Sequence, residues 1–191
     1  MKVRTRLLAG SLAVAAVLSL AIGWAIARVG NDDDGDTGDS ARPTFDVPSI
    51  ETNAVVRGKP LPSVNVQLLD GSSIDVASLA GQPLVINVWG STCGPCKQEL
   101  PDFAAAHLTY GDQVRFVGID YLAPSAREEA FARDRGVQYE LLYDGNGEFI
   151  TAVGIAAFPV TLVVDADGFV VRQTGQLDEA TLAQYIESDL L

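Results

Sequence analysis

The segment Leu84–Trp89 (LVINVW) most constrains the fold, because it is nearly continuous in apolar residues. A run of this length without regular polar alternation is typical of a strand that is covered on both faces of a sheet. Strand and helix patterns alternate along the rest of residues 57–190, with turn residues between them. The sequence therefore predicts one α/β domain built around a mixed sheet.

The other predicted elements follow in chain order. An N-terminal β-hairpin joins 64–68 to 73–75, and a short helical turn follows at 78–81. After the strand at 84–89 we expect a helix at 93–108, a strand at 114–119 and a helix that opens on a capping box of Ser125 and Glu128 and stops at Gly136. A strand at 140–143, a helix at 148–153, a hairpin of 160–164 with 169–174, and a helix from Asp178 to about 190 complete the chain.

The first 29 residues differ from the rest in charge. The chain has 13 basic and 25 acidic residues, and four of the basic ones, with no acidic residue, fall in 1–29. The remainder is therefore strongly acidic, which disfavours contact with phosphate backbones, and we expect no nucleic-acid binding. Because 48% of the residues are hydrophobic, disorder of the whole chain is excluded.

Residues 7–27 form an uncharged stretch of 21 residues. As a helix this stretch would span roughly 30 Å, the thickness of one hydrocarbon core. Three basic residues (Lys2, Arg4 and Arg6) precede it, which predicts a cytoplasmic N-terminus and a body outside the cytoplasm. We expect residues 1–29 to be a signal-anchor with one transmembrane helix. The alternative is a signal peptide, cleaved after the Ala-Ile-Ala sequence at 25–27, and a secreted protein.

Residues 30–53 are predicted to be a flexible acidic linker that leads to a folded domain over 54–191. The stretch 30–43 (GNDDDGDTGDSARP) holds five aspartates and three glycines but no bulky apolar residue, so it cannot form a core. A calcium-binding loop is the alternative for the aspartates. The glutamate that closes an EF-hand loop is missing at the required spacing, which disfavours that alternative.

The two cysteines of the chain, Cys93 and Cys96, enclose Gly94 and Pro95 directly after the predicted central strand. A bridge between them closes too short a loop to stabilise the chain much, so a reactive role explains the pair better. The start of a helix favours a thiolate, and Pro95 suits a first helical turn. We therefore predict a redox-active Cys93–Cys96 disulfide, in which Cys93 is the attacking nucleophile and Cys96 the resolving thiol.

A structural zinc site is not expected within the chain. Tetrahedral zinc takes four ligands, whereas this sequence offers one cysteine pair and a single histidine, His107. We expect neither a metal nor another cofactor.

Residues 89–101 (WGSTCGPCKQELP) resemble the active-site segment of the TlpA/ResA-like membrane-anchored thiol-disulfide oxidoreductases. The resemblance covers about residues 57–190, including GKPLP at 58–62, GIAAFPVT at 154–161 and DADG at 165–168. It implies the thioredoxin-like fold, a three-layer sandwich with a mixed central sheet and an N-terminal β-hairpin, preceded by one transmembrane helix. Within the motif, it implies that Trp89, Gly94 and Pro95 support the cysteine pair.

The resemblance also implies roles for single residues. Pro159 matches the cis-proline of the family and, with Phe158, would contact the substrate. Asn87 stands where cytoplasmic thioredoxins have a buried aspartate that moves protons, which an amide cannot do. Glu99 matches an acidic residue of ResA-like members and is the candidate proton acceptor for Cys96, with a raised pKa if buried. The alternative for Glu99 is a solvated helix glutamate.

Three positions depart from the family pattern. Thr92 replaces the tryptophan that usually precedes the first cysteine, Gly90 replaces a common alanine, and Phe158 is bulkier than the usual residue before the proline. These departures leave the exchange chemistry possible and bear on substrate preference.

The function implied by the resemblance is that of an extracytoplasmic protein-disulfide reductase, monomeric and anchored in a bacterial cell membrane. It would act on cysteines of secreted proteins, with apocytochrome c before haem attachment as the favoured substrate, and draw electrons from a membrane donor of the CcdA/DsbD kind. The alternatives are a disulfide-forming oxidase or isomerase, and a non-enzymatic copper-handling protein on the same fold. Such copper proteins use a histidine near the proline loop, and none follows His107.

Overall fold

The computed structural model describes residues 52–191. In these residues seven strands form one mixed sheet in the order β2-β1-β5-β4-β3-β6-β7. The strands are β1 (Asn65–Gln67), β2 (Ser73–Asp75), β3 (Leu84–Trp89), β4 (Arg115–Asp120), β5 (Glu140–Tyr143), β6 (Val160–Val164) and β7 (Val170–Thr174). The central strands β3, β4 and β5 run parallel, and the remaining pairings are antiparallel. The predicted mixed sheet and N-terminal hairpin are confirmed.

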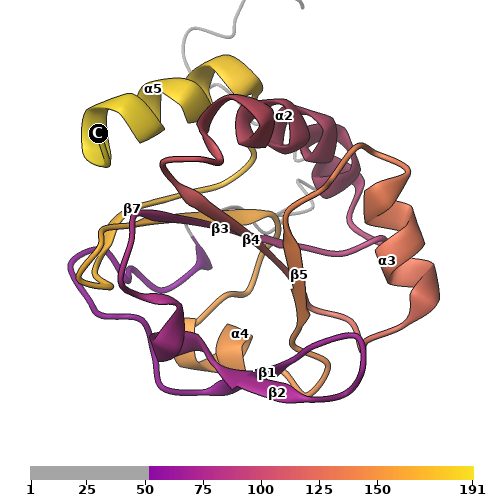
Figure 1. Ribbon diagram of the computed structural model, residues 1–191. Coiled ribbons are helices and arrows are strands. Elements are labelled where there is room, and N and C mark those ends of the chain that lie inside the picture. The colour runs from indigo at the N-terminus through magenta and orange to yellow at the C-terminus, as the bar shows by residue number, and fades with distance from the viewer. Residues whose placement is uncertain (1–51) are drawn as a thin grey trace, which may run out of the picture. The chain divides into compact units, whose positions relative to one another are not determined.

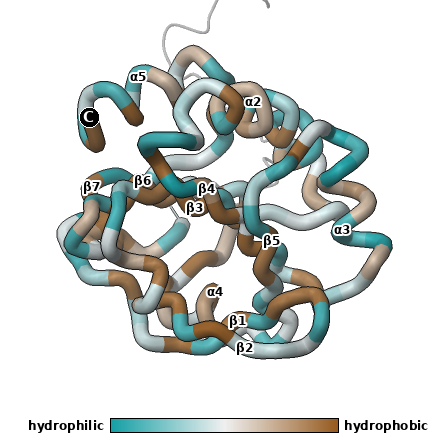
Figure 2. Tube along the Cα trace, in the orientation of Figure 1, coloured by the Kyte–Doolittle hydropathy of each residue, from teal (hydrophilic) through white to brown (hydrophobic). Residues whose placement is uncertain are grey.

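Strand β3 lies inside the sheet, and all six of its residues are buried. Its side chains alternate between two apolar cores: Leu84, Ile86 and Val88 pack in one, and Val85 and Trp89 in the other. Figure 2 shows hydrophobic residues concentrated along these central strands. A strand that serves two cores needs apolar residues at nearly every position, which is the pattern that the sequence displays.

Helices cover both faces of the sheet (Figure 1). Helices α2 (Gly94–Tyr110), α3 (Ala126–Arg133) and α5 (Glu179–Asp189) contribute residues to the core that holds Trp89. The opposite core is closed by α4 (Glu148–Val153), the 3-10 turn η2 (Val76–Leu79) and β1. This is the three-layer, thioredoxin-like arrangement that the resemblance implies.

The predicted transmembrane helix at 7–27 lies outside the described residues. None of the helices within 52–191 combines the length and the apolar character that are needed to cross a membrane.

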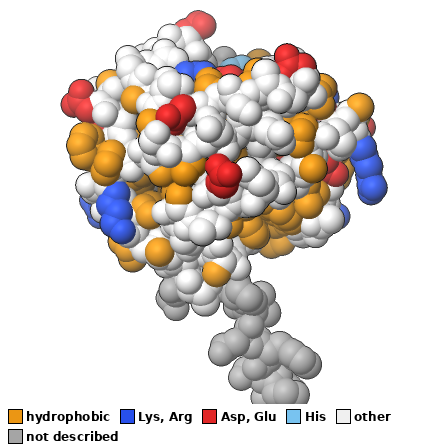
Figure 3. Space-filling view, turned by 90° about the horizontal axis from the view of Figure 1, so that it is seen from below, with side chains coloured by type: hydrophobic (Ala, Val, Ile, Leu, Met, Phe, Trp, Pro, Cys, Tyr) orange, Lys and Arg blue, Asp and Glu red, His pale blue; other side chains and the backbone are white. Residues whose placement is uncertain are grey.

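The face of the body opposite α2 and α5 is seen in Figure 3, where hydrophobic side chains lie among singly placed acidic and basic ones. Basic side chains do not gather into a patch on that visible face of the described residues.

The predicted capping box of α3 forms only in half. Ser125 Oγ accepts a hydrogen bond from the Glu128 N–H at 3.2 Å, as predicted. The Glu128 carboxylate does not return to the Ser125 backbone, because it accepts a bond from Ser91 Oγ at 2.8 Å instead. The helix also ends at Arg133, three residues before the predicted stop at Gly136. A tertiary contact has thus displaced a local one.

Residues 53 and 54, on either side of the predicted boundary, both hydrogen-bond to the folded body. Asn53, the last residue assigned to the linker, is 7% exposed, and its side chain hydrogen-bonds to the main chain of Ala156 and Ala157. The N–H of Ala54 also donates to the Gly154 carbonyl at 2.9 Å. These long-range bonds tie residues 53 and 54 to the segment between α4 and β6.

Candidate active site

The two cysteines lie where β3 passes into α2, and they are joined by a disulfide with an S–S distance of 2.04 Å. Cys93 is the N-cap residue of α2, and its sulfur accepts a bond from the Cys96 N–H at 3.2 Å. Cys93 is partly exposed, whereas Cys96 is fully buried. The disulfide predicted from the sequence is confirmed, and Cys93 is the more exposed of its two residues.

Residues on both sides of the cysteine pair fix its position at the start of α2. Trp89 ends β3 fully buried, and its ring stacks on Phe131 of α3 with centroids 6.0 Å apart. Gly94 and Pro95 are exposed in the first turn of α2, where a proline needs no hydrogen-bond acceptor. The buried tryptophan therefore anchors the end of the strand, while the exposed turn lies next to the partly exposed Cys93.

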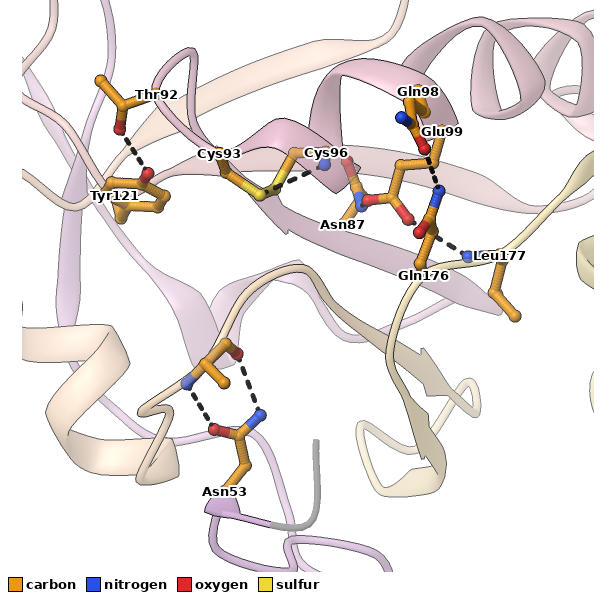
Figure 4. The surroundings of a disulfide bond; sticks show 11 residues. Asn53, Asn87, Thr92, Cys93, Cys96, Gln98, Glu99, Tyr121, Gln176 and Leu177 are labelled. Carbon is orange, nitrogen blue, oxygen red and sulfur yellow. Dashed lines mark hydrogen bonds between the residues drawn. A yellow bond between two sulfur atoms is a disulfide. The ribbon is translucent and has the colours of Figure 1, made fainter. Parts of the chain in front are cut away.

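Glu99 lies on the buried side of α2, so the alternative of a solvated helix glutamate is wrong. Its two carboxyl oxygens accept bonds from Asn87 Nδ2 at 2.6 Å and from the Leu177 N–H at 3.2 Å, which converge on it in Figure 4. Burial outweighs these two bonds and raises the pKa of Glu99 to about 8. At neutral pH, with the disulfide closed, Glu99 holds its proton.

The predicted substrate-contacting residues immediately precede β6, the strand that pairs with β3. The Phe158–Pro159 peptide bond is cis, as the resemblance implies. Phe158 and Cys93 are both partly buried, and both pack against the core that contains Trp89 and Cys96. Cys93, Cys96 and Glu99 all belong to the start of α2, and Phe158, which comes from the segment before β6, packs against the same core as Cys93.

Asn53 holds the loop that leads to Phe158 (Figure 4). Its Oδ1 accepts bonds from the N–H groups of Ala156 at 2.6 Å and Ala157 at 2.8 Å, and its Nδ2 donates to the Ala157 carbonyl at 3.0 Å. One buried amide therefore satisfies both main-chain polar groups of Ala157, as a neighbouring strand would. Nothing in the local sequence around residue 53 points to this contact.

Tyr121 also belongs to the site, and the sequence did not single it out. Its hydroxyl is 2.6 Å from Thr92 Oγ1, and its ring centroid is 4.3 Å from that of Phe158. The sequence could have indicated this position, because the residues that follow neighbouring parallel strands lie at the same edge of a sheet. Strands β3 and β4 pair Trp89 with Asp120, so the residues that follow both strands emerge side by side.

A buried carboxyl pair lies behind the loop before Cys93. Asp120 is fully buried, and Glu128, which binds Ser91, is 5% exposed. Burial, with a further contribution from the charge of Glu128, raises the pKa of Asp120 to about 7. One oxygen of each carboxyl group has no hydrogen-bond partner among the described residues. Within residues 52–191, no group of three or more His, Cys, Asp or Glu side chains is arranged to hold a metal.

A partly exposed sulfur at a helix N-terminus, bonded to a buried sulfur one turn further in, is suited to thiol–disulfide exchange. The positive end of the helix and the Cys96 N–H both favour negative charge on the Cys93 sulfur. A buried acid that holds a proton near neutral pH can exchange it with a thiolate.

Comparison with known proteins agrees with this chemistry. The Redoxin family model matches residues 56–187. A curated relative, thiol-disulfide oxidoreductase ResA of Halalkalibacterium halodurans, is 27% identical over 121 residues, which cover 62% of this chain and 69% of ResA.

Solved structures of disulfide oxidoreductases are also similar to this chain. A secreted disulfide oxidoreductase of Mycobacterium tuberculosis has a TM-score of 0.57 and 25% identity, covering 66% of this chain and 96% of its own. A DsbF homologue of Corynebacterium diphtheriae has a TM-score of 0.60 and 25% identity, covering 68% and 86%. With the motif, the fold and the disulfide in agreement, the chain belongs to the Redoxin family, is TlpA/ResA-like within it, and is a protein-disulfide oxidoreductase.

Proposed function

We propose that the protein is a membrane-anchored, extracytoplasmic reductase of protein disulfides. The observation that carries the proposal is the unequal burial of the two cysteines: Cys93 is partly exposed, whereas Cys96 is fully buried. A substrate approaches an exposed cysteine more readily than a buried one. This inequality supports Cys93 as the attacking thiol and Cys96 as the resolving thiol.

The reductive half-reaction balances as two exchanges. The Cys93 thiolate attacks a substrate disulfide, a mixed disulfide forms, and one substrate sulfur leaves as a thiolate. The Cys96 thiolate then attacks the Cys93 sulfur, which closes the Cys93–Cys96 disulfide and releases the second substrate sulfur. The substrate gains two electrons and the enzyme loses two.

Glu99 moves the proton in this scheme. As Cys96 becomes nucleophilic it must lose a proton, and the Glu99 carboxylate accepts it. A pKa of about 8 lies close to the ordinary thiol value of about 8.5, so transfer in either direction is nearly balanced. When the disulfide is reduced again, protonated Glu99 returns the proton to the leaving Cys96 sulfur. Asn87 and Leu177 hold the carboxyl group in place.

The direction of electron transfer and the cellular location are inferred from the sequence and its family resemblance. The Gly-Pro pair between the cysteines resembles that of reducing members of the family. The uncharged stretch at 7–27, with three basic residues before it, supports an anchor in a bacterial cell membrane and a body outside the cytoplasm. A reductase in that location takes electrons from a membrane donor of the CcdA/DsbD kind, and acts on cysteines of secreted proteins.

Apocytochrome c before haem attachment is the substrate that we propose, because its Cys-x-x-Cys-His segment readily forms a disulfide between neighbouring cysteines. The reduced full chain should reduce an oxidised peptide of this sequence. A peptide with the same cysteines spaced far apart serves as the comparison. Faster reduction of the distant pair would contradict the substrate assignment.

A redox titration tests the direction. The full-length protein in detergent is equilibrated with dithiothreitol or glutathione buffers, and the thiol content is measured. A reductase should show a midpoint at or below about −250 mV, whereas a midpoint above about −180 mV would identify a disulfide-forming oxidase or isomerase.

A further inference from the structure

The three departures from the family pattern meet at one side chain, that of Tyr121. Its hydroxyl contacts Thr92 Oγ1 at 2.6 Å, immediately before Cys93 (Figure 4). Its ring lies against Phe158, immediately before the cis-proline, with centroids 4.3 Å apart and an interplanar angle of 33°. Tyr121 therefore connects the loop before the reactive cysteine to the loop before Pro159.

Gly90 provides the space for this ring. A Cβ atom at position 90 would lie 2.5 Å from Tyr121 Cε1 and 2.6 Å from Cζ, closer than such atoms approach one another. The ring occupies the volume that an alanine methyl group would need. The three positions that depart from the pattern implied by the resemblance, 90, 92 and 158, thus all adjoin the side chain of Tyr121.

We propose that Tyr121 is a specificity-determining residue of the exchange reaction. Together with Phe158, its ring forms an apolar wall that receives a bulky apolar side chain next to the reacting cysteine of the substrate. The proposal rests on the assignment of Cys93 as the attacking thiol.

The apolar wall lies where the residues that flank the substrate cysteine are expected. A substrate sulfur must reach Cys93, so the residues that flank it in an extended peptide, about 3.3 Å away along the chain, must lie on the surface beside Cys93. Tyr121 and Phe158 are both partly exposed. Tyr121 contacts Thr92, which immediately precedes Cys93, and Phe158 packs against Tyr121. Rings that are partly open to water favour an apolar neighbour over a polar one.

The proposal predicts a preference among substrates. Two disulfide-bonded peptides that differ only in the residue after the cysteine, leucine in one and serine in the other, are reduced by the full-length protein in detergent micelles. We expect the wild type to favour the leucine peptide in kcat/KM by about 10-fold, the usual size of such an apolar contact. Tyr121→Ala should lower this ratio to near one, and Tyr121→Phe, which keeps the ring, should preserve it.

Hydroxyethyl disulfide, which has no neighbouring side chain, is the matched control. The rate of each peptide is divided by the rate with this small disulfide, so that the ratio reports the neighbouring side chain and not the exchange step itself. A large loss with this small disulfide in Tyr121→Ala would show that Tyr121 serves the fold or the cysteine itself, and would overturn the proposal. Phe158→Ala removes the other ring from the opposite loop, and should abolish the preference in the same way.

Two different results would contradict the role of Tyr121 and the proposed reductase function. Equal rates with the leucine and serine peptides in the wild type would overturn the role of Tyr121 alone. A wild-type protein that reduces hydroxyethyl disulfide but neither peptide would overturn the proposed function as a reductase of protein disulfides, and this inference with it.

Discussion

The replacement of Glu99 by glutamine tests the buried acid through the pH dependence of stability. Glu99 has a pKa of about 8 in the folded oxidised protein, against 4.5 for an ordinary glutamate. The folded chain therefore binds this proton more tightly than the unfolded chain does. Stability is then fully present below about pH 4.5 and is lost as the pH rises towards 8.

The pKa difference sets the magnitude. At 1.36 kcal/mol for each pKa unit, the contribution lost by pH 8 to 9 is at most about 5 kcal/mol, and water that enters the site would reduce it. Glutamine cannot ionise and so contributes no pH dependence. Its single oxygen can serve only one of the two donors, Asn87 Nδ2 or the Leu177 N–H, which costs about 1–3 kcal/mol at every pH.

The assay is urea unfolding of the disulfide form of the full chain in detergent, at pH values from 5 to 9. The wild type should be more stable than Glu99→Gln at pH 5, and the order should reverse by pH 9. Asp120, whose pKa is also raised, titrates in both proteins and cancels in the difference. A difference in unfolding free energy that stays constant from pH 5 to 9 would refute the reasoning.

Four further outcomes are expected. In the reduced protein, Glu99→Gln should lower the apparent pKa of the thiol pair and slow exchange, measured as the pH dependence of thiol alkylation; superimposable curves would exclude proton transfer through Glu99. Cys96→Ser should trap a mixed disulfide on non-reducing gels and Cys93→Ser should not, so equal trapping would reverse the assignment of the thiols. Asn53→Ala should lower the unfolding free energy by about 2–3 kcal/mol, since three hydrogen bonds are lost, two of them buried. The full chain should remain in membranes after alkaline washing, with its body open to external protease; recovery of a mature soluble form that begins at Arg28 would show cleavage instead.

Local sequence predicted those elements whose formation depends on local or periodic features. Strand β3 was predicted at its observed bounds because a strand between two cores is apolar throughout. Helix α4 was also predicted at its observed bounds, because Gly154 ends it in the left-handed conformation with φ 64°. The cysteine pair and its place at a helix start followed from spacing alone.

Side-chain contacts between distant segments could not be predicted in the same way. The burial of Glu99 depends partly on Leu177, 78 residues further along, and the half-formed capping box reflects competition from Ser91, 37 residues away from Glu128. The clamp from Asn53 spans more than 100 residues. Each contact depends on which loops the sheet brings together, and a single sequence contains no periodic signal for that.

The close approach of Tyr121 to Gly90 constrains how this site can evolve. With Tyr121 present, a methyl group at position 90 meets the ring at 2.5 Å, so a change to alanine there must displace the ring. A smaller residue at position 121 would remove all three of the nearest atoms that the methyl group meets. The cost of one substitution therefore depends on the other. Among relatives, alanine at the equivalent of position 90 should accompany a smaller residue at the equivalent of position 121.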